Sequence, residues 1–256
     1  MGEERAARSG EIAALRAGLD LGMTLIDTAE MYGEGAAEEL VAEAIAGRRD
    51  SVFLVSKFYP HHATKRLVAA SCENSLRRLK TDRLDLYLLH WPGPTPLAET
   101  LEALQELKQA GKIAHYGVSN FDVDGMKDAL RTAGGEGIAT DQVLYNLSRR
   151  GTEWDLLPWL RERAIPLMAY SPVEQGRILD RPVLRSIASR RRATPAQVAL
   201  AWLLRNPDLL AIPKAATAEH VRENRGALDL QLTSDDLKDL EQAFPAPTRK
   251  RALEML

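Results

Sequence analysis

The sequence predicts an α/β protein of the (β/α)8 barrel class. Short apolar runs that fit buried strands alternate along the 256 residues with longer stretches whose apolar side chains recur every three or four positions, as they do in helices. This alternation predicts parallel strands joined by right-handed crossovers. Seven strand-like runs are too many for most small open sheets, and no glycine-rich turn follows the first. Both features favour a closed barrel over a doubly wound sheet.

The predicted strands are short apolar runs that end at polar or charged residues. In chain order they span residues 24–27, 52–57, 84–90, 113–118, 140–144, 166–170 and 209–213. Proline ends two of them, at Trp91-Pro92 and at Ser171-Pro172, because proline has no N–H to donate to a neighbouring strand.

The predicted helices share a 3.6-residue apolar period and recognisable end signals. They span residues 11–21, 36–46, 65–79, 96–110, 124–133, 154–163, 182–191, 195–205, 218–227 and 234–243. Gly22 stops the first helix. Pro182 and Pro195 lie near the first turn of their helices, where the missing N–H costs little. Thr233 or Ser234 is the expected N-cap of the last helix.

The strand count is one short of a barrel. The chain opens with a helix, so if residues 11–21 form the first barrel helix, the strand before it is missing from this sequence. Seven strands alone would leave two unpaired edges, which promote aggregation. We therefore expect either that Met1 is an internal residue of a longer product, which we favour, or that another segment fills the gap. Residues 1–256 are expected to form one barrel domain.

The composition of the chain indicates which partners and which cellular compartment to expect. The net charge of −2 gives no broad basic field, so we expect neither a nucleic-acid nor a membrane partner. Cys72 is the only cysteine, which excludes an intrachain disulfide. No apolar run has the length of a signal peptide core or of a membrane span. We expect a cytoplasmic monomer.

The ends of the first three predicted strands carry reactive side chains. Asp27 and nearby Tyr32 follow the first strand, Lys57 ends the second, and His90 ends the third. In such barrels the working groups lie at the carboxyl ends of the strands. Taken singly, Asp27, Lys57 and His90 would each be interpreted as non-catalytic. A lone Asp after a strand usually caps a turn, a lone Lys is usually solvated and a lone His is usually structural. Their occurrence at three consecutive strand ends predicts a catalytic group instead.

These four residue types together suit protonation of a carbonyl oxygen. A phenol is a sluggish acid at neutral pH, with a reference pKa of about 10. A neighbouring ammonium stabilises the phenolate and lowers that pKa, and a buried ammonium needs a carboxylate partner. An imidazole can hydrogen-bond a carbonyl oxygen and orient it. Tyr32 would then donate the proton that hydride addition to a carbonyl requires, with Lys57, Asp27 and His90 in support.

This constellation resembles the aldo-keto reductase superfamily. The matching stretches are Asp-Thr-Ala-Glu-Met-Tyr-Gly at 27–33, Val-Ser-Lys ending at Lys57, Leu-Leu-His-Trp-Pro around His90, and Gly-Val-Ser-Asn-Phe at 117–121. The resemblance covers the chain from Glu11 onward and looks closest to the small bacterial reductases acting on methylglyoxal or diketo-gluconate. It implies an NADP(H) cofactor, with NAD(H) not excluded. The family's N-terminal hairpin and the Gly-Thr-rich loop after its first strand have no counterpart here.

The resemblance also implies which residues contact the cofactor. Ser119, Asn120 and Gln142 would bind the nicotinamide carboxamide, Tyr170 would stack on the ring with Ser171 beside it, Lys214 would meet the adenosine 2′-phosphate, and Glu223 and Asn224 would contact the adenine. Many family members carry Ser and Arg where this chain has Ala215 and His220. The grip on the 2′-phosphate is therefore expected to be weaker.

The expected function is NAD(P)H-dependent reduction of small aldehydes or ketones. Trp91 and Tyr59 are candidates for the wall of the substrate pocket, and the short tail after Phe244 favours small substrates. The pair His61-His62 lacks a fitting third ligand, so no metal site is expected. Two alternatives stay open. One is a regulatory module that binds the cofactor with little turnover, and the other is a barrel isomerase or lyase that uses Lys57 as a Schiff base.

Overall fold

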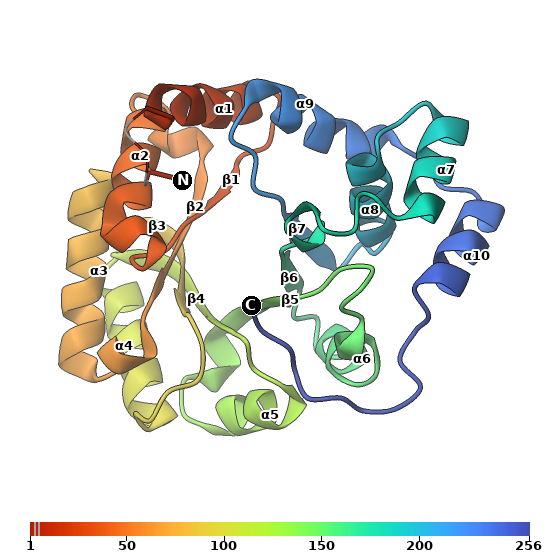
Figure 1. Ribbon diagram of the computed structural model, residues 1–256. Helices are drawn as coiled ribbons and strands as arrows, with labels where there is room; N and C mark the ends of the chain where they lie inside the picture. Colours follow the sequence, from red (N-terminus) through yellow and green to blue (C-terminus); the bar gives the residue numbers. More distant parts are fainter. Residues whose placement is uncertain (3, 5) are drawn as a thin grey trace. The chain divides into compact units, whose positions relative to one another are not determined.

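The computed structural model describes residues 1, 2, 4 and 6–256, and these divide into two compact units. The first unit is Met1–Asp141 with Ala216–Ala218, and the second is Gln142–Ala215 with Glu219–Leu256. In Figure 1 the first unit runs from red to green along the chain and the second from green to blue. The described residues contain seven strands, the number predicted from the sequence.

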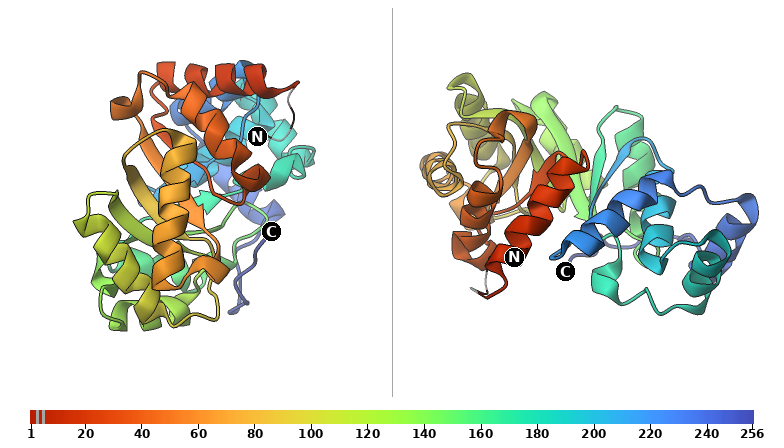
Figure 2. Two further views of the ribbon diagram at one scale, coloured as in Figure 1. Left: turned by 90° about the vertical axis from the view of Figure 1, so that its left-hand side faces the viewer. Right: turned by 90° about the horizontal axis from the view of Figure 1, so that it is seen from above.

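The first unit is built of parallel strands with helices between them. Its elements are α1 (Arg8–Asp20), β1 (Leu25–Asp27), α2 (Ala36–Ala44), β2 (Phe53–Phe58), α3 (Lys65–Leu79), β3 (Leu84–Leu89), α4 (Leu97–Gln109), β4 (Ile113–Ser119), α5 (Val123–Arg131) and the start of β5 (Ile138–Leu144). Strands β1 to β4 pair in chain order and in parallel. Helices α2, α3 and α4 lie side by side along them, as the left view of Figure 2 shows.

The second unit repeats the strand and helix pattern. Strand β6 (Leu167–Tyr170) pairs in parallel with β7 (Leu209–Ile212). The helices are α6 (Leu156–Arg161), α7 (Pro182–Arg191), α8 (Pro195–Leu204), α9 (Ala218–Gly226) and α10 (Ser234–Ala243). Helix α8 is buried along nearly its whole length, and Trp202 on it is one of the largest fully buried side chains. That burial explains why its sequence is apolar on almost every face.

The end signals in the sequence locate most helix boundaries to within three residues. Helices α3, α7 and α10 have the predicted bounds. Thr233 caps α10, accepting a hydrogen bond from the Asp236 N–H while the Asp236 carboxylate accepts one from the Thr233 N–H. The helix predicted at 154–163 is shorter. It starts only at Leu156, after a 3₁₀ turn at Gly151–Glu153, because Asp155 has a non-helical backbone (φ −140°).

Among the residues with described positions, no helix is both long enough and apolar enough to cross a membrane.

Candidate active site

The register of β1 and β2 brings Asp27 next to Lys57. Asp27 pairs with Val55, and Lys57 is two residues further along, so its side chain leaves the same face of the sheet as that of Val55. Beyond β1 the chain stays paired with β2, because the Thr28 N–H donates to the Val55 carbonyl and the Glu30 N–H donates to the Lys57 carbonyl. The Asp27 carboxylate consequently lies 2.7 Å from the Lys57 ammonium.

A tight turn brings the Tyr32 phenol back to this pair. The Tyr32 N–H donates to the Ala29 carbonyl, and the next three residues all have left-handed backbones: Gly33 (φ 57°), Glu34 (φ 52°) and Gly35 (φ 95°). Glycine adopts that conformation at little cost, which explains its use at two of the three positions. The Lys57 ammonium donates to the Tyr32 hydroxyl at 3.3 Å. The turn therefore places the Tyr32 hydroxyl beside the Asp27–Lys57 pair.

Lys57 is a fully buried ammonium whose three donors are all used. It donates to the Asp27 carboxylate, to the Thr28 carbonyl at 2.9 Å and to the Tyr32 hydroxyl. Burial alone would lower the pKa of Lys57, but the Asp27 carboxylate and the Tyr32 hydroxyl together outweigh it and hold that pKa above its ordinary value. Lys57 is thus a permanent positive charge beside the phenol at neutral pH. A charged ammonium in this state forms no Schiff base, which argues against the isomerase or lyase reading.

His90 follows β3 and faces Tyr32. Its N–H donates to the Phe58 carbonyl, which extends the pairing of β2 with β3, and its ring meets the Tyr32 ring edge-on with centroids 5.7 Å apart. Burial, with a smaller effect of the Lys57 charge, lowers the pKa of His90 to about 3. The imidazole is therefore neutral at physiological pH. A neutral ring can donate one hydrogen bond to a carbonyl oxygen without competing for the proton of the phenol.

Aromatic rings adjoin His90 within the first unit. The Trp91 ring lies 4.9 Å from the His90 ring and 5.9 Å from the Tyr59 ring, centroid to centroid. Trp91 and Tyr59 are both half-buried, as side chains that contact a small substrate would be. Sequence reasoning did not identify Glu30, whose buried carboxylate accepts hydrogen bonds from the Tyr59 N–H and the His62 ring, both at 2.8 Å. Its position in the sequence, three residues after Asp27, was the one feature that could have marked Glu30 as part of the site.

The residues predicted to contact the cofactor are distributed over both units. Ser119 and Asn120 lie in the first unit at the end of β4, where the Asn120 side chain donates to the His90 carbonyl at 3.0 Å. The others belong to the second unit. There Gln142 is buried in β5, Tyr170 ends β6, Ser171 follows it, Lys214 is exposed after β7, and Glu223 and Asn224 are half-exposed on α9.

Two buried carboxyl groups near these positions had no role in the sequence predictions. Asp141 on β5 is fully buried and accepts a hydrogen bond from the Phe121 N–H, the residue after Asn120. Its burial raises the pKa of Asp141 well above the usual range. Glu174, four residues after Tyr170, is also buried but is surrounded by hydrogen-bond donors. The local sequence could have predicted a buried carboxyl group at Asp141, because it is an acid within an apolar strand. No local sequence feature predicts the burial of Glu174.

Comparison with known proteins identifies the family. The model of the aldo/keto reductase family matches residues 1–244. The chain is 49% identical over 261 residues to the methylglyoxal reductase YeaE of Escherichia coli K12, covering 100% of this chain and 92% of that protein.

Solved structures agree with this match. An aldo/keto reductase from Klebsiella pneumoniae, crystallised with NADP and acetate, has a TM-score of 0.98 at 52% identity, covering 100% of this chain and 92% of that one. A putative 2,5-diketo-D-gluconic acid reductase B has a TM-score of 0.85 at 33% identity, covering 97% and 87%. These similarities confirm the predicted (β/α)8 barrel class and the resemblance to aldo-keto reductases noted from the sequence. The chain belongs to the aldo/keto reductase family.

Proposed function

We propose that this protein reduces small aldehydes and ketones such as methylglyoxal to alcohols, with NADPH as the reductant. The observation that carries the proposal is the Tyr32 hydroxyl 3.3 Å from the buried Lys57 ammonium, which is itself 2.7 Å from the Asp27 carboxylate. This arrangement suits a phenol that gives up its proton, because the adjacent positive charge stabilises the phenolate left behind.

Each of the four side chains has a defined part in the proposed reaction. The bound cofactor supplies the hydride. Tyr32 donates its hydroxyl proton to the carbonyl oxygen as negative charge develops there, and Lys57 stabilises the resulting phenolate. Asp27 keeps Lys57 charged and in place. Neutral His90 donates a hydrogen bond to the same oxygen and so orients the carbonyl toward Tyr32.

The residues of the first unit fit a nicotinamide beside this group. Asn120 donates to the His90 carbonyl, so a proposed nicotinamide contact adjoins the residue proposed to orient the substrate. In the second unit, Gln142, Tyr170 and Ser171 would contact the nicotinamide, Lys214 the 2′-phosphate, and Glu223 with Asn224 the adenine. The NADP-bound Klebsiella relative, at 52% identity, supports NADP as the cofactor, and the residue assignments follow the family resemblance.

Substrate and setting are part of the same proposal. Trp91 and Tyr59, beside His90, would contact the carbonyl compound and favour small ones. The similarity to YeaE, a methylglyoxal reductase, supports that substrate class. We further propose that the protein acts as a cytoplasmic monomer without nucleic-acid or membrane partners, in line with its net charge of −2.

Turnover and binding should be measured together. NADPH oxidation is followed by absorbance with and without methylglyoxal, the alcohol product is identified by chromatography, and NADPH binding is titrated by fluorescence. We expect carbonyl-dependent oxidation with one alcohol formed per NADPH consumed. NADPH binding without any turnover on a panel of small aldehydes would contradict the proposal and favour the regulatory module.

A further inference from the structure

The turn that follows β6 is held in an unusual backbone conformation. Ser171 (φ 48°), Glu174 (φ 51°), Gln175 (φ 55°) and Gly176 (φ 87°) all have left-handed backbones, although only the last is a glycine. Each non-glycine residue in this region costs free energy that other contacts must offset. Residues 171–176, called the 171–176 turn below, therefore depend on side-chain contacts to keep their shape.

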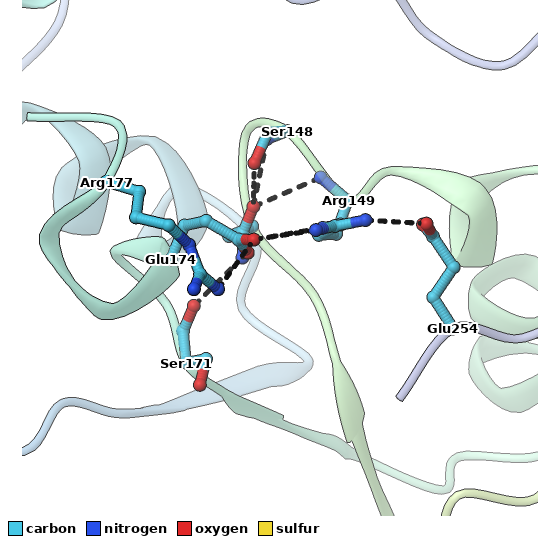
Figure 3. Close-up of polar contacts among 7 residues, drawn as sticks. Ser148, Arg149, Ser171, Glu174, Arg177 and Glu254 are labelled. Atoms are coloured by element: carbon cyan, nitrogen blue, oxygen red, sulfur yellow. Dashed lines mark hydrogen bonds and ion pairs between the residues drawn. The ribbon is translucent and has the colours of Figure 1, made fainter. Parts of the chain in front are cut away.

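The Glu174 carboxylate provides these contacts. Figure 3 shows it at the centre of a polar cluster within the second unit. One oxygen accepts from the Asn146 amide at 2.8 Å, and the other accepts from Arg149 at 2.9 and 3.1 Å and from Arg177 at 3.2 Å. The Glu174 side chain is only 5% exposed. Burial by itself would raise the pKa of Glu174, yet the donors from Arg149, Asn146 and Arg177 outweigh it and lower that pKa, so the group is ionised.

Asn146 joins the turn to the segment after β5. It is fully buried, and its amide nitrogen donates to both the Ser171 carbonyl and Glu174. Its amide oxygen accepts from the Ser148 hydroxyl and from the backbone N–H groups of Ser148 and Arg149. The first residue of the 171–176 turn and the Glu174 side chain are thus tied to one amide, and both donors of that amide are used.

The cluster is not arranged to bind an anion. Arg149 and Arg177 are both paired with Glu174, and Arg149 also pairs with Glu254 at 2.7 Å. Two positive and two negative side chains leave no excess charge. The buried carboxylate therefore acts on the turn itself, and the turn begins directly after Tyr170.

We propose that Glu174 is a positioning residue that fixes the 171–176 turn and thereby holds Tyr170 and Ser171 in place for the cofactor. The inference rests on the proposed function, in which Tyr170 and Ser171 contact NADPH. Glu174 does not take part in proton or hydride transfer. Its loss should weaken cofactor binding without slowing the chemical step.

The second contact of Arg149 offers a matched control. The Arg149–Glu254 pair uses the same guanidinium, but its side chains are 34% and 42% exposed, whereas Glu174 is buried. Exposed ion pairs contribute little, because water and salt screen them. Glu254→Gln removes the same charge as Glu174→Gln from the other side of Arg149, so any difference between the variants reports the buried contact.

The experiment combines hydrogen exchange of the cofactor-free protein with cofactor binding and single-turnover kinetics. For Glu174→Gln we expect faster amide exchange confined to the 171–176 turn. The Kd for NADPH should rise about tenfold, because Tyr170 and Ser171 would no longer be held in place for the cofactor. The single-turnover rate at saturating NADPH should stay within about twofold. Glu254→Gln should match the wild type in all three measurements.

Unchanged exchange in Glu174→Gln, or faster exchange with an unchanged Kd for NADPH, would overturn the inference. A slower chemical step at saturating cofactor would also overturn it. If Glu174→Gln does not fold, Arg149→Lys, which keeps the charge but loses the paired donors of the guanidinium, is judged by the same criteria. Failure of the proposed function is separable, since it would appear as absent NADPH binding or turnover in the wild type.

Discussion

Replacing Asp27 by Asn tests whether the buried ion pair organises the site. The Lys57 side chain is 0% exposed and that of Asp27 is 6% exposed, with 2.7 Å between the charged atoms. The substitution keeps the size of the side chain and one acceptor oxygen but removes the negative charge. Lys57 would then be a buried cation whose remaining partners, the Thr28 carbonyl and the Tyr32 hydroxyl, are neutral.

The expected loss of stability follows from the distance. At 2.7 Å and an effective dielectric constant of about 20, the attraction amounts to about 6 kcal/mol. Asn retains a hydrogen bond to the ammonium, so about half of this should be lost, ~3 kcal/mol, near the lower limit for breaking a buried pair. This is a large share of a total stability of about 5–15 kcal/mol.

Urea unfolding at neutral pH measures this loss, with Asp50→Asn as the control. Asp50 pairs with Arg83 in the same unit, but its side chain is 91% exposed, so the control should match the wild type within error. The pH dependence gives a second readout. Because Asp27 raises the pKa of Lys57, the pair stabilises the fold fully below about pH 10 and less as pH rises through the raised pKa. An Asp27→Asn variant as stable as Asp50→Asn, or with the alkaline profile of the wild type, would refute the reasoning.

Three further predictions follow from the charges of the site. Because the pKa of His90 is lowered to about 3, kcat/KM for methylglyoxal should show no acid limb near pH 6.5, and a limb there that disappears in His90→Gln would contradict this. Because burial raises the pKa of Asp141, the unfolded chain releases that proton near pH 4 while the folded protein keeps it, so wild-type stability falls as pH rises above about 4. Asp141→Asn should therefore gain stability relative to the wild type between pH 4 and 7 in urea unfolding, and a constant difference would count against the buried neutral acid. Lys214→Met should raise the Kd for NADPH roughly five- to tenfold and leave the Kd for NADH unchanged, as expected for the loss of one exposed phosphate contact. Equal changes for both cofactors would contradict the proposed contact between Lys214 and the 2′-phosphate.

The strands and the catalytic residues Asp27, Tyr32, Lys57 and His90 could be predicted from the sequence, because both depend on local apolar patterns and on the parallel register of neighbouring strands. Apolar runs located β2 and β3, and a parallel pairing automatically aligns their polar ends, so Lys57 and His90 meet the Asp27 segment. These features need no knowledge of distant contacts.

The hydrogen-bond partners of the buried carboxylates Glu30 and Glu174 could not be predicted in this way. Glu30 and Glu174 acquire their partners only when loops far apart in sequence meet, as with Glu174 and Asn146, 28 residues apart. Three non-glycine residues of the 171–176 turn have positive φ, for which their side chains give no local warning. The helix predicted at 154–163 was too long for a related reason, since the Asp155 backbone departs from helical geometry despite a continuous apolar period.

The most direct test of the account is the single-turnover rate of NADPH oxidation by Tyr32→Phe. The substitution removes only the hydroxyl that Lys57 contacts at 3.3 Å. With saturating NADPH and methylglyoxal, we expect the rate to fall by about 10²–10⁴-fold, the usual worth of a positioned proton donor. The Kd for NADPH should stay within about twofold of the wild type. A Tyr32→Phe variant that oxidises NADPH at the wild-type rate would show that the proton comes from elsewhere and would contradict the central claim.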